Sequence, residues 1–378
     1  MAYPHSRSTY ADLASGPTSV HAHLSDEAFI RAILQFERAL ALSARECGII
    51  SDAQCEDATR AVDSFDTDLE AIAVESAAGG NPAIPIVKAL KRSAADPAGI
   101  HVGATSQDAV DTALTLCFVK AGEALSEELD HLVELLVALT REHRETPMIG
   151  RTLGQQANPT TFGCVVAGWL EGLLMAREDL QLALERIPIQ YGGATGTLAA
   201  VHPQGLVLHD ALARKLGLQS RPLIWHTNRV PFVRVSSALA EVAGACRKIA
   251  SDVVFLSATE VGELREANPG GSSSMPHKAN PAAAVAADGY ARRAPGLHAT
   301  MVDAMDSRLQ RGVGSWHAEW LTLRELFALT ASTVSRTTAS LEGINVNSEV
   351  MKDHLNETAT LGHAIDIVDD VLARKESQ

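Results

Sequence analysis

The sequence predicts an all-α protein built around a bundle of long helices. Three stretches carry apolar residues at steps of three and four, which places an apolar stripe along one side of each helix. Alternating β-branched residues are almost absent and aromatic residues make up only 4% of the chain, so we expect little or no sheet. Helices this long can bury their stripes only by packing along one another.

A small helical domain is expected over residues 1–105, ahead of the long helices. Ser25 and Asp26 can cap a helix that carries Phe29, Ile33 and Leu40 on one side. Shorter helical patterns follow at about 52–64, 67–78 and 85–95, separated by turns. The segment from Asp96 to Thr105 then predicts a loop.

The bundle itself is expected over residues 106–340. Its apolar stripes run from Leu114 to Leu139, from Phe162 to Leu184 and from Val235 to Leu256, and a further helix is expected from Trp316 to about Leu341. One subunit cannot cover helices of this length, which predicts oligomerisation. Residues 341–378 contain two short helical patterns and predict a short carboxyl-terminal domain.

Composition restricts the possible partners. The chain has 378 residues, of which 46% are hydrophobic and 21% charged, and a formal charge of −14, which argues against nucleic-acid or anionic-membrane partners. Five widely spaced cysteines favour reduced thiols and a cytoplasmic protein. Residues 1–19 lack the apolar segment of a signal peptide, and no uncharged stretch is long enough for a membrane span. Nucleotide, zinc-protease and hydrolase motifs are absent, so no metal or cofactor is expected.

Residues 270–281, here called the signature loop, have the sequence GGSSSMPHKANP. The paired glycines allow a close approach of the backbone to a ligand, and Pro276 and Pro281 stiffen the far side. Hydroxyls, an ammonium and a carboxamide give the loop many donors for an anionic oxygen. A flexible linker is the alternative, but this proline-containing sequence favours an ordered functional loop.

The signature loop resembles the signature of the fumarase/aspartase superfamily at every fixed position of that motif. The resemblance implies a three-domain all-α fold and a homotetramer with active sites shared between subunits. It also implies that Ser272 transfers a proton while Lys278 and Asn280 hold a substrate carboxylate, with Ser273 and Met275 contacting the same small di- or tricarboxylate.

A second motif, HVGATSQD, occupies residues 101–108. Thr105 and Asp108 have the spacing of a capping box, which would bring hydroxyls and free amides together at a helix N-terminus. Simple helix capping and a structural histidine are the alternatives. The resemblance to the superfamily implies anion binding by Thr105 and Ser106 and an acid or base role for His101.

A third motif, GRTLGQQANPTT, occupies residues 150–161. It resembles a superfamily motif in which a histidine stands where this chain has Leu153. Arg151, Thr152 and Gln155 are expected to contact a carboxylate. The alternative for Arg151 is the default role of an arginine in a loop, a surface charge or a structural ion pair. An apolar residue at position 153 suggests a reaction that needs no protonation of the leaving group, and Gln156 offers no histidine either.

Two further segments extend the resemblance. The glycine turn YGGATGT at residues 191–197 places Thr195 among the expected site residues, with a plain tight turn as the alternative. SWHAEW at 315–320, preceded by Arg311, and WHTNR at 225–229 resemble the muconate cycloisomerase branch of the superfamily. Arg311 is therefore also expected to bind substrate.

This branch resemblance implies lactonisation of 3-carboxy-cis,cis-muconate to a carboxymuconolactone, in protocatechuate degradation, through an aci-carboxylate intermediate. A fumarate-releasing lyase of the adenylosuccinate or argininosuccinate type is the alternative reaction, and a catalytically silent helical scaffold is an alternative of another class. The sequence leaves open whether the 3-substituent of the substrate is a carboxylate or a sulfonate, and which group is the general acid.

Overall fold

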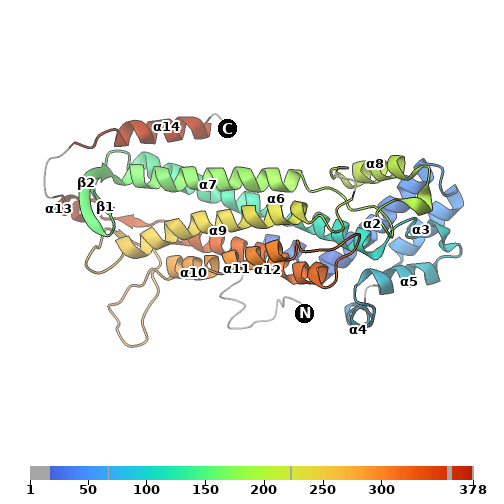
Figure 1. Ribbon diagram of the computed structural model, residues 1–378. Helices are drawn as coiled ribbons and strands as arrows, with labels where there is room; N and C mark the ends of the chain where they lie inside the picture. The colour runs from blue at the N-terminus through green and yellow to red at the C-terminus, as the bar shows by residue number, and fades with distance from the viewer. Residues whose placement is uncertain (1–17, 67, 222–223, 356–359, 377–378) are drawn as a thin grey trace.

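The computed structural model describes residues 18–66, 68–221, 224–355 and 360–376 of the chain, and these ranges form a long helical molecule (Figure 1). Residues 1–17, which belong to the segment 1–19 in which no signal peptide is expected, lie outside the described residues. The prediction of an all-α fold with little sheet is confirmed, because the strands described form only two short two-stranded sheets.

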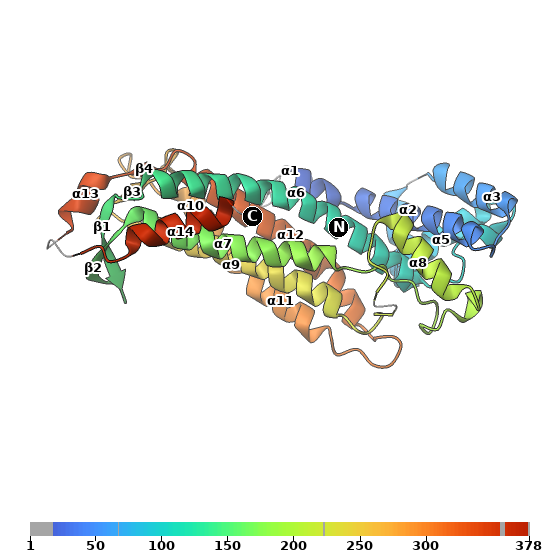
Figure 2. The same cartoon turned by 90° about the horizontal axis from the view of Figure 1, so that it is seen from above.

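Four long helices lie side by side along the molecule (Figures 1 and 2). They are α6 (Ser106–Glu142), α7 (Phe162–Glu185), α9 (Val230–Leu256) and α12 (Ser315–Leu341), with α10 (Ala282–Ala291) and α11 (Ala294–Asp303) packed against α9 and α12. At about 1.5 Å per residue, the 37 residues of α6 span roughly 55 Å. The length of α6 therefore separates the two ends of the bundle.

The predicted apolar stripes form the core of this bundle. Leu129 and Leu136 of α6, Leu173 of α7 and Ile249 of α9 have no exposed surface. Phe118 of α6 stacks on Phe327 of α12, with ring centroids 5.1 Å apart and planes 9° apart. Such burial and ring packing account for the side-by-side arrangement of the helices.

Shorter helices gather at the amino-terminal end of α6. They are α2 (Asp26–Glu46), α3 (Asp52–Asp63), α4 (Leu69–Gly79), α5 (Ala83–Ser93) and α8 (Gly205–Leu216), with short 3-10 turns η1 (Pro97–Gly99) and η2 (Ala199–Val201). The short helix α1 (Thr18–His23) instead packs along α6 (Figure 2). The predicted cap is present, since Ser25 Oγ accepts the backbone N–H of Ala28 at 3.1 Å. Helices α2 and α6 pack together and join this group to the bundle.

An antiparallel hairpin of β1 (Pro147–Thr152) and β2 (Gln155–Thr161) lies at the opposite end. The sequence did not predict it. Its two-residue turn has positive φ at both Leu153 (53°) and Gly154 (77°), which suits a hairpin but is normally signalled by Asn-Gly or Asp-Gly. Leu153 at the tip is fully exposed, at 102% of its reference surface.

The carboxyl-terminal segment packs back onto the bundle. Strand β3 (Leu264–Arg265) pairs with β4 (Asn345–Val346), α13 (Ser348–Asp353) contacts β1, and α14 (Ala364–Glu376) lies along α7. Surface ion pairs such as Arg144 with Asp369, at 2.6 Å, hold α14 in place. The division of the chain into domains at residues 105 and 341 stays a prediction.

Three further features concern disulfides, membrane spans and metal sites. All five cysteines are unpaired, and Cys55, Cys117 and Cys246 are buried. Within the described ranges, no helix has both the length and the apolar composition needed to cross a bilayer. In the same ranges, no cluster of His, Cys, Asp and Glu is suited to hold a metal ion.

Candidate active site

The predicted site residues fall into two groups at opposite ends of α6. His101, Thr105 and Ser106 lie at its amino-terminal end, joined there by the turns that carry Thr195 and Arg311. The third motif follows the carboxyl-terminal end of α6, and the signature loop connects β3 to α10 near that same end (Figure 1). Within one chain the two groups are thus roughly 50 Å apart.

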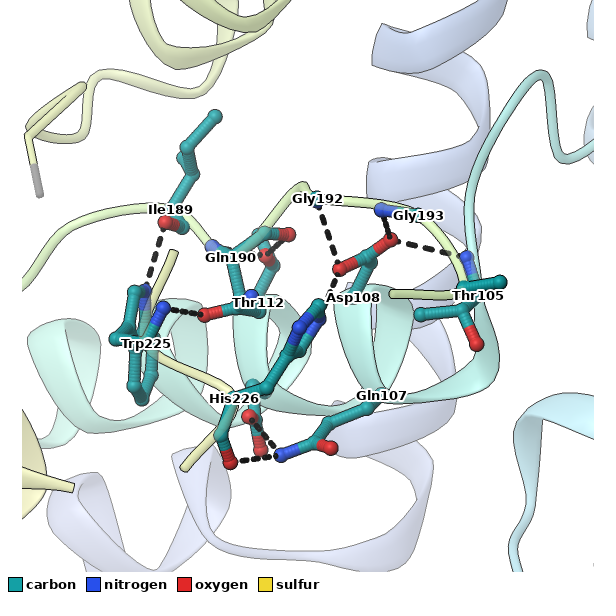
Figure 3. Close-up of polar contacts among 12 residues, drawn as sticks. Thr105, Gln107, Asp108, Thr112, Ile189, Gln190, Gly192, Gly193, Trp225 and His226 are labelled. Carbon is teal, nitrogen blue, oxygen red and sulfur yellow. Dashed lines mark hydrogen bonds and ion pairs between the residues drawn. The ribbon is translucent and has the colours of Figure 1, made fainter. Parts of the chain in front are cut away.

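Asp108 organises the first group (Figure 3). Its Oδ1 accepts the N–H of Gly192 at 3.0 Å, and its Oδ2 accepts the N–H groups of Gly193 and Thr105, both at 2.9 Å. Gly193 adopts a φ of 74°, and a Cβ there would lie 2.9 Å from the backbone oxygen of Gly103. A glycine is therefore required where this turn meets the start of α6.

A histidine from a third segment completes the contacts of this carboxylate. Nε2 of His226 lies 2.6 Å from Oδ1 of Asp108, and both side chains are buried. Nδ1 of His226 is buried without a hydrogen-bond partner among the described residues. Because Nε2 faces a carboxylate, it is the nitrogen that carries the proton in the neutral ring.

Arg311 holds the Thr195 turn from its other side. Its Nη1 donates to Oε1 of Gln107 at 2.6 Å, and its Nη2 donates to the carbonyls of Gly193 and Ala194 at 3.1 and 3.2 Å. Burial lowers the pKa of Arg311. The guanidinium is occupied by the side chain of Gln107 and by two backbone carbonyls, which suits a residue that shapes the turn.

His101 is held by a buried carboxylate that the sequence analysis did not identify. Oε1 of Glu37 lies 2.6 Å from Nδ1 of His101, and Oε2 accepts the backbone N–H of the same residue at 2.9 Å. Burial disfavours the charged imidazole, but Glu37 and the nearby Asp108 outweigh this effect and raise the pKa of His101. His101 is therefore oriented and held in its protonated form over a wider pH range.

The expected anion-binding hydroxyls differ in their exposure, and of these residues Ser106 lines the same pocket as His101. Thr105 and Ser106 are half-buried, and Thr105 caps α6 as its spacing predicts. Thr195 is exposed, with its hydroxyl 3.3 Å from that of Thr197. The hydroxyls thus lie at the start of a long helix, where backbone N–H groups and the helix dipole favour an anion.

Below this surface, a buried ion-pair network joins the two tryptophan-containing motifs. Nη2 of Arg229 donates to Glu319 at 2.6 Å and Nη1 donates to Asp111 at 2.8 Å, while Nε1 of Trp316 donates to Asp111 at 2.8 Å. Burial opposes the charge on Arg229, yet the two carboxylates together raise its pKa. The network fixes α9 and α12 against α6.

At the opposite end, Arg151 forms a two-pronged ion pair. Its Nη1 and Nη2 donate to Glu263 at 2.9 and 2.6 Å, and Nδ1 of His354 lies 2.6 Å from the same carboxylate. Glu263 has no exposed side-chain surface. Of the three residues expected to contact a substrate carboxylate, Arg151 is paired with Glu263 of the same chain. Thr152 and Gln155 are exposed beside the hairpin turn.

The signature loop is ordered around Ser272. Its Oγ accepts the backbone N–H groups of Ser274 at 3.3 Å and Met275 at 3.1 Å. These two donors are aimed at the oxygen on which negative charge would develop if Ser272 lost its proton. The loop therefore carries a built-in means of stabilising a serine alkoxide.

Other residues close the loop at its base. Asn280 pairs its backbone with Gly270 and donates its side-chain amide to the carbonyl of Gly271 at 3.0 Å. Glu266 accepts the first N–H groups of α10, from Ala284 at 2.9 Å and from Ala283 at 3.2 Å. Ser273, Met275 and Lys278 lie on the exposed part of the loop.

Sequence reasoning missed Glu37, His226 and Glu263 as parts of the two groups. Glu37 did give a signal, because a charged residue at position 37 interrupts an apolar stripe that contains Ile33 and Leu40. His226 lies within the WHTNR motif, which assigns it no role of its own. Glu263 follows a helix end and has no local pattern that distinguishes it from a surface acid.

Comparisons with known proteins show the family to which the chain belongs. A family profile described as Lyase matches residues 22–296. A 3-carboxy-cis,cis-muconate cycloisomerase of Pseudomonas aeruginosa is 40% identical over 369 residues, covering 94% of this chain and 79% of that protein. A nitrosuccinate lyase of Streptomyces davaonensis is 37% identical and covers 90% of this chain and 75% of that protein.

A solved structure gives the same result for the fold. The 3-carboxy-cis,cis-muconate lactonizing enzyme of Pseudomonas putida superimposes with a TM-score of 0.83 and 32% identity. The match covers 97% of this chain and 88% of that one. The arrangement of helices is thus similar in both proteins.

Proposed function

Since the chain belongs to the lyase family of the fumarase/aspartase superfamily, we propose that it is a cycloisomerase that lactonises 3-carboxy-cis,cis-muconate. Several relatives that are 35 to 40% identical over most of the chain carry that name. This similarity is the observation that carries the proposal. The signature loop supports it, because two backbone amides of the loop donate to Oγ of Ser272.

The reaction forms one carbon–oxygen bond and adds one proton. One carboxylate of the substrate attacks a doubly bonded carbon, the adjacent carbon gains a proton, and the trianion becomes a dianion. Between these events the electrons of the double bond lie on the carboxylate next to the second carbon, as an aci-carboxylate. Lys278 and Asn280 stabilise that charge, and Ser272 exchanges the proton with carbon.

A serine is a poor base unless its alkoxide is stabilised. The N–H groups of Ser274 and Met275 supply such stabilisation in the loop as folded. Lys278 adds a positive charge when the loop closes over a bound substrate. The loop is therefore suited to move a proton at a carbon next to a carboxylate.

Leu153 fits this reaction better than an elimination of amine or hydroxide. Read in reverse, lactonisation expels a carboxylate, which is a weak base and departs without protonation. An exposed apolar residue at the tip of the hairpin supplies no proton, and the reaction requires none at that position.

A complete site requires more than one copy of the chain. His101 and Ser272 lie at opposite ends of the roughly 55 Å helix α6, so a small substrate can meet both only if they come from different subunits. Exposed apolar side chains on α10 and α11, Val285 and Val302 among them, support further helix packing. We therefore include a homotetramer with shared active sites in the proposal. The unpaired cysteines support a cytoplasmic location, which we include as well.

The nitrosuccinate lyase relative favours a second candidate, β-elimination from a substituted succinate with release of fumarate or a related product. Incubating the purified protein separately with 3-carboxy-cis,cis-muconate, nitrosuccinate, adenylosuccinate and argininosuccinate distinguishes the two. The proposal predicts loss of the diene absorbance with the first compound and no cleavage of the others. Cleavage of one of the others with an untouched muconate supports the second candidate.

A further inference from the structure

A pocket of about 420 Å³ opens between helix α5 and the start of α6. Ile84 and Val87 form its apolar lining, and His101 and Ser106 border it on the α6 side. This volume is within the range of pockets that bind small molecules. The pocket is therefore continuous with the site residues expected at this end of the bundle.

Three cationic side chains, Lys88, Lys91 and Arg92, also line this pocket. Positions 84, 87, 88 and 91 follow the three- and four-residue steps that place side chains on one side of a helix. Among the described residues, none of these three cations forms a salt bridge, whereas several other lysines do. In a chain with a net charge of −14, an unpaired cationic cluster that faces a pocket indicates an anionic ligand.

The charges around His101 come from three helices. Burial and Lys91 of α5 oppose its protonated form, whereas Glu37 of α2 and Asp108 of α6 favour it and together outweigh them, so the pKa of His101 is raised. Lys91 is thus close enough to act on the imidazole electrostatically. An anion bound between Lys91 and His101 would reduce the repulsion between these two groups.

We infer that Lys88 and Lys91, together with His101, form a subsite for the substrate carboxylate that takes no part in bond formation. This inference rests on the proposed function. In the lactonisation one carboxylate attacks and a second becomes the aci-carboxylate, so a third remains unchanged and requires its own charge partner. Lys88 and Lys91 would then determine the preference for a tricarboxylate over a dicarboxylate.

Steady-state kinetics on the assembled protein tests this subsite. At low ionic strength, Lys91→Met and the double variant Lys88→Met/Lys91→Met should raise KM for 3-carboxy-cis,cis-muconate about tenfold or more, with kcat changed less than about twofold. Lys91→Arg should keep most of the wild-type KM. Lys120→Met is the control, because Lys120 lies on α6 and pairs with the exposed Glu123.

Binding measurements separate failure of the subsite from failure of the proposed reaction. By titration calorimetry, the wild type should bind tricarballylate, which has three carboxylates, more tightly than glutarate, which has two. In the double variant, the ratio of the two dissociation constants should fall about tenfold. Unchanged KM and unchanged preference in the double variant overturn the subsite, as does a wild type without any preference. A wild type that binds with the stated preference but does not lactonise muconate overturns only the reaction.

Discussion

The imidazole of His226 and the carboxylate of Asp108 lie 2.6 Å apart, in the buried space where three separate segments of the chain meet. Asp108 also accepts hydrogen bonds from the amides of Thr105, Gly192 and Gly193. One carboxylate thus positions the start of α6, the Thr195 turn and the segment before α9. The hydroxyls expected to bind substrate depend on it for their placement.

Replacing Asp108 by asparagine should loosen this junction. The new amide cannot accept two of the N–H groups that the carboxylate accepts, and burial makes unmade hydrogen bonds costly, so we expect a loss of about 3 kcal/mol of unfolding free energy. Denaturant unfolding and hydrogen exchange at Gly192 and Gly193 measure it. Asp63→Asn, at an exposed pair with Arg38, should cost less than about 1 kcal/mol. Unchanged exchange in Asp108→Asn would contradict this role.

Arg151→Met should destabilise the hairpin end of the molecule. The variant leaves Glu263 buried without its guanidinium, although His354 still contacts it, and losing one partner of a buried pair costs about 3 to 5 kcal/mol. Thermal and denaturant unfolding provide the measurement. The double variant Arg151→Met/Glu263→Met is the matched control and should recover most of the loss. If the double variant is no more stable than the single one, the buried pair does not explain the effect.

Glu37→Gln should change the pH dependence of both stability and activity. Because the pKa of His101 is raised in the folded protein, its stabilising contribution is full below about pH 6.5, the ordinary value for histidine. That contribution is lost as pH rises through the raised pKa. The variant removes the charge that raises it, so stability should fall less over that range.

The value of kcat/KM for Glu37→Gln should drop about tenfold or more near neutral pH, because the variant favours the neutral form of His101 and so removes a positive charge next to the substrate carboxylate. Unfolding temperature and kcat/KM are measured from pH 5 to pH 9. The control is Glu342→Gln, at an exposed carboxylate–histidine pair with His131, which should leave both profiles unchanged. Parallel profiles for the wild type and Glu37→Gln would exclude this role of Glu37.

Ser272→Ala should abolish turnover without unfolding the protein. The side chain is on a loop outside the core, so the unfolding temperature and the oligomeric state should be retained while the proton-exchanging oxygen is lost. Loss of the muconate diene absorbance measures turnover. Ser274→Ala tests a neighbouring hydroxyl and should stay within about tenfold of the wild-type rate. Near-normal rates in Ser272→Ala would remove this residue from the mechanism.

The sequence predicted the long helices well, because their apolar stripes and caps are local signals. Thr105 was expected at the start of α6, and its amide bonds to Asp108 as the capping spacing implies. The hairpin was missed, because its turn is Leu153-Gly154 rather than a sequence typical of such turns. Tertiary contacts with α13 and the buried Glu263 stabilise it instead.

The candidate site was predictable motif by motif, but its internal connections were not. Nothing local shows that Glu37 would bond to His101, 64 positions further along the chain, or that Arg151 would pair with Glu263. Such pairs depend on how helices and strands pack. The separation of the motifs also follows from the fold, since His101 precedes the amino-terminal end of α6, whereas the loop that carries Ser272 lies near the other end of that helix.

Mixing two inactive variants tests most directly whether lactonisation occurs in a site shared between subunits. Ser272→Ala and His101→Ala subunits are each assayed with 3-carboxy-cis,cis-muconate, then mixed in equal amounts, dissociated and reassembled. We predict that each alone is inactive and that the mixture regains roughly a quarter of wild-type activity, the fraction of shared sites in which both residues are native after random exchange. Subunits that exchange without regaining any activity would contradict the account.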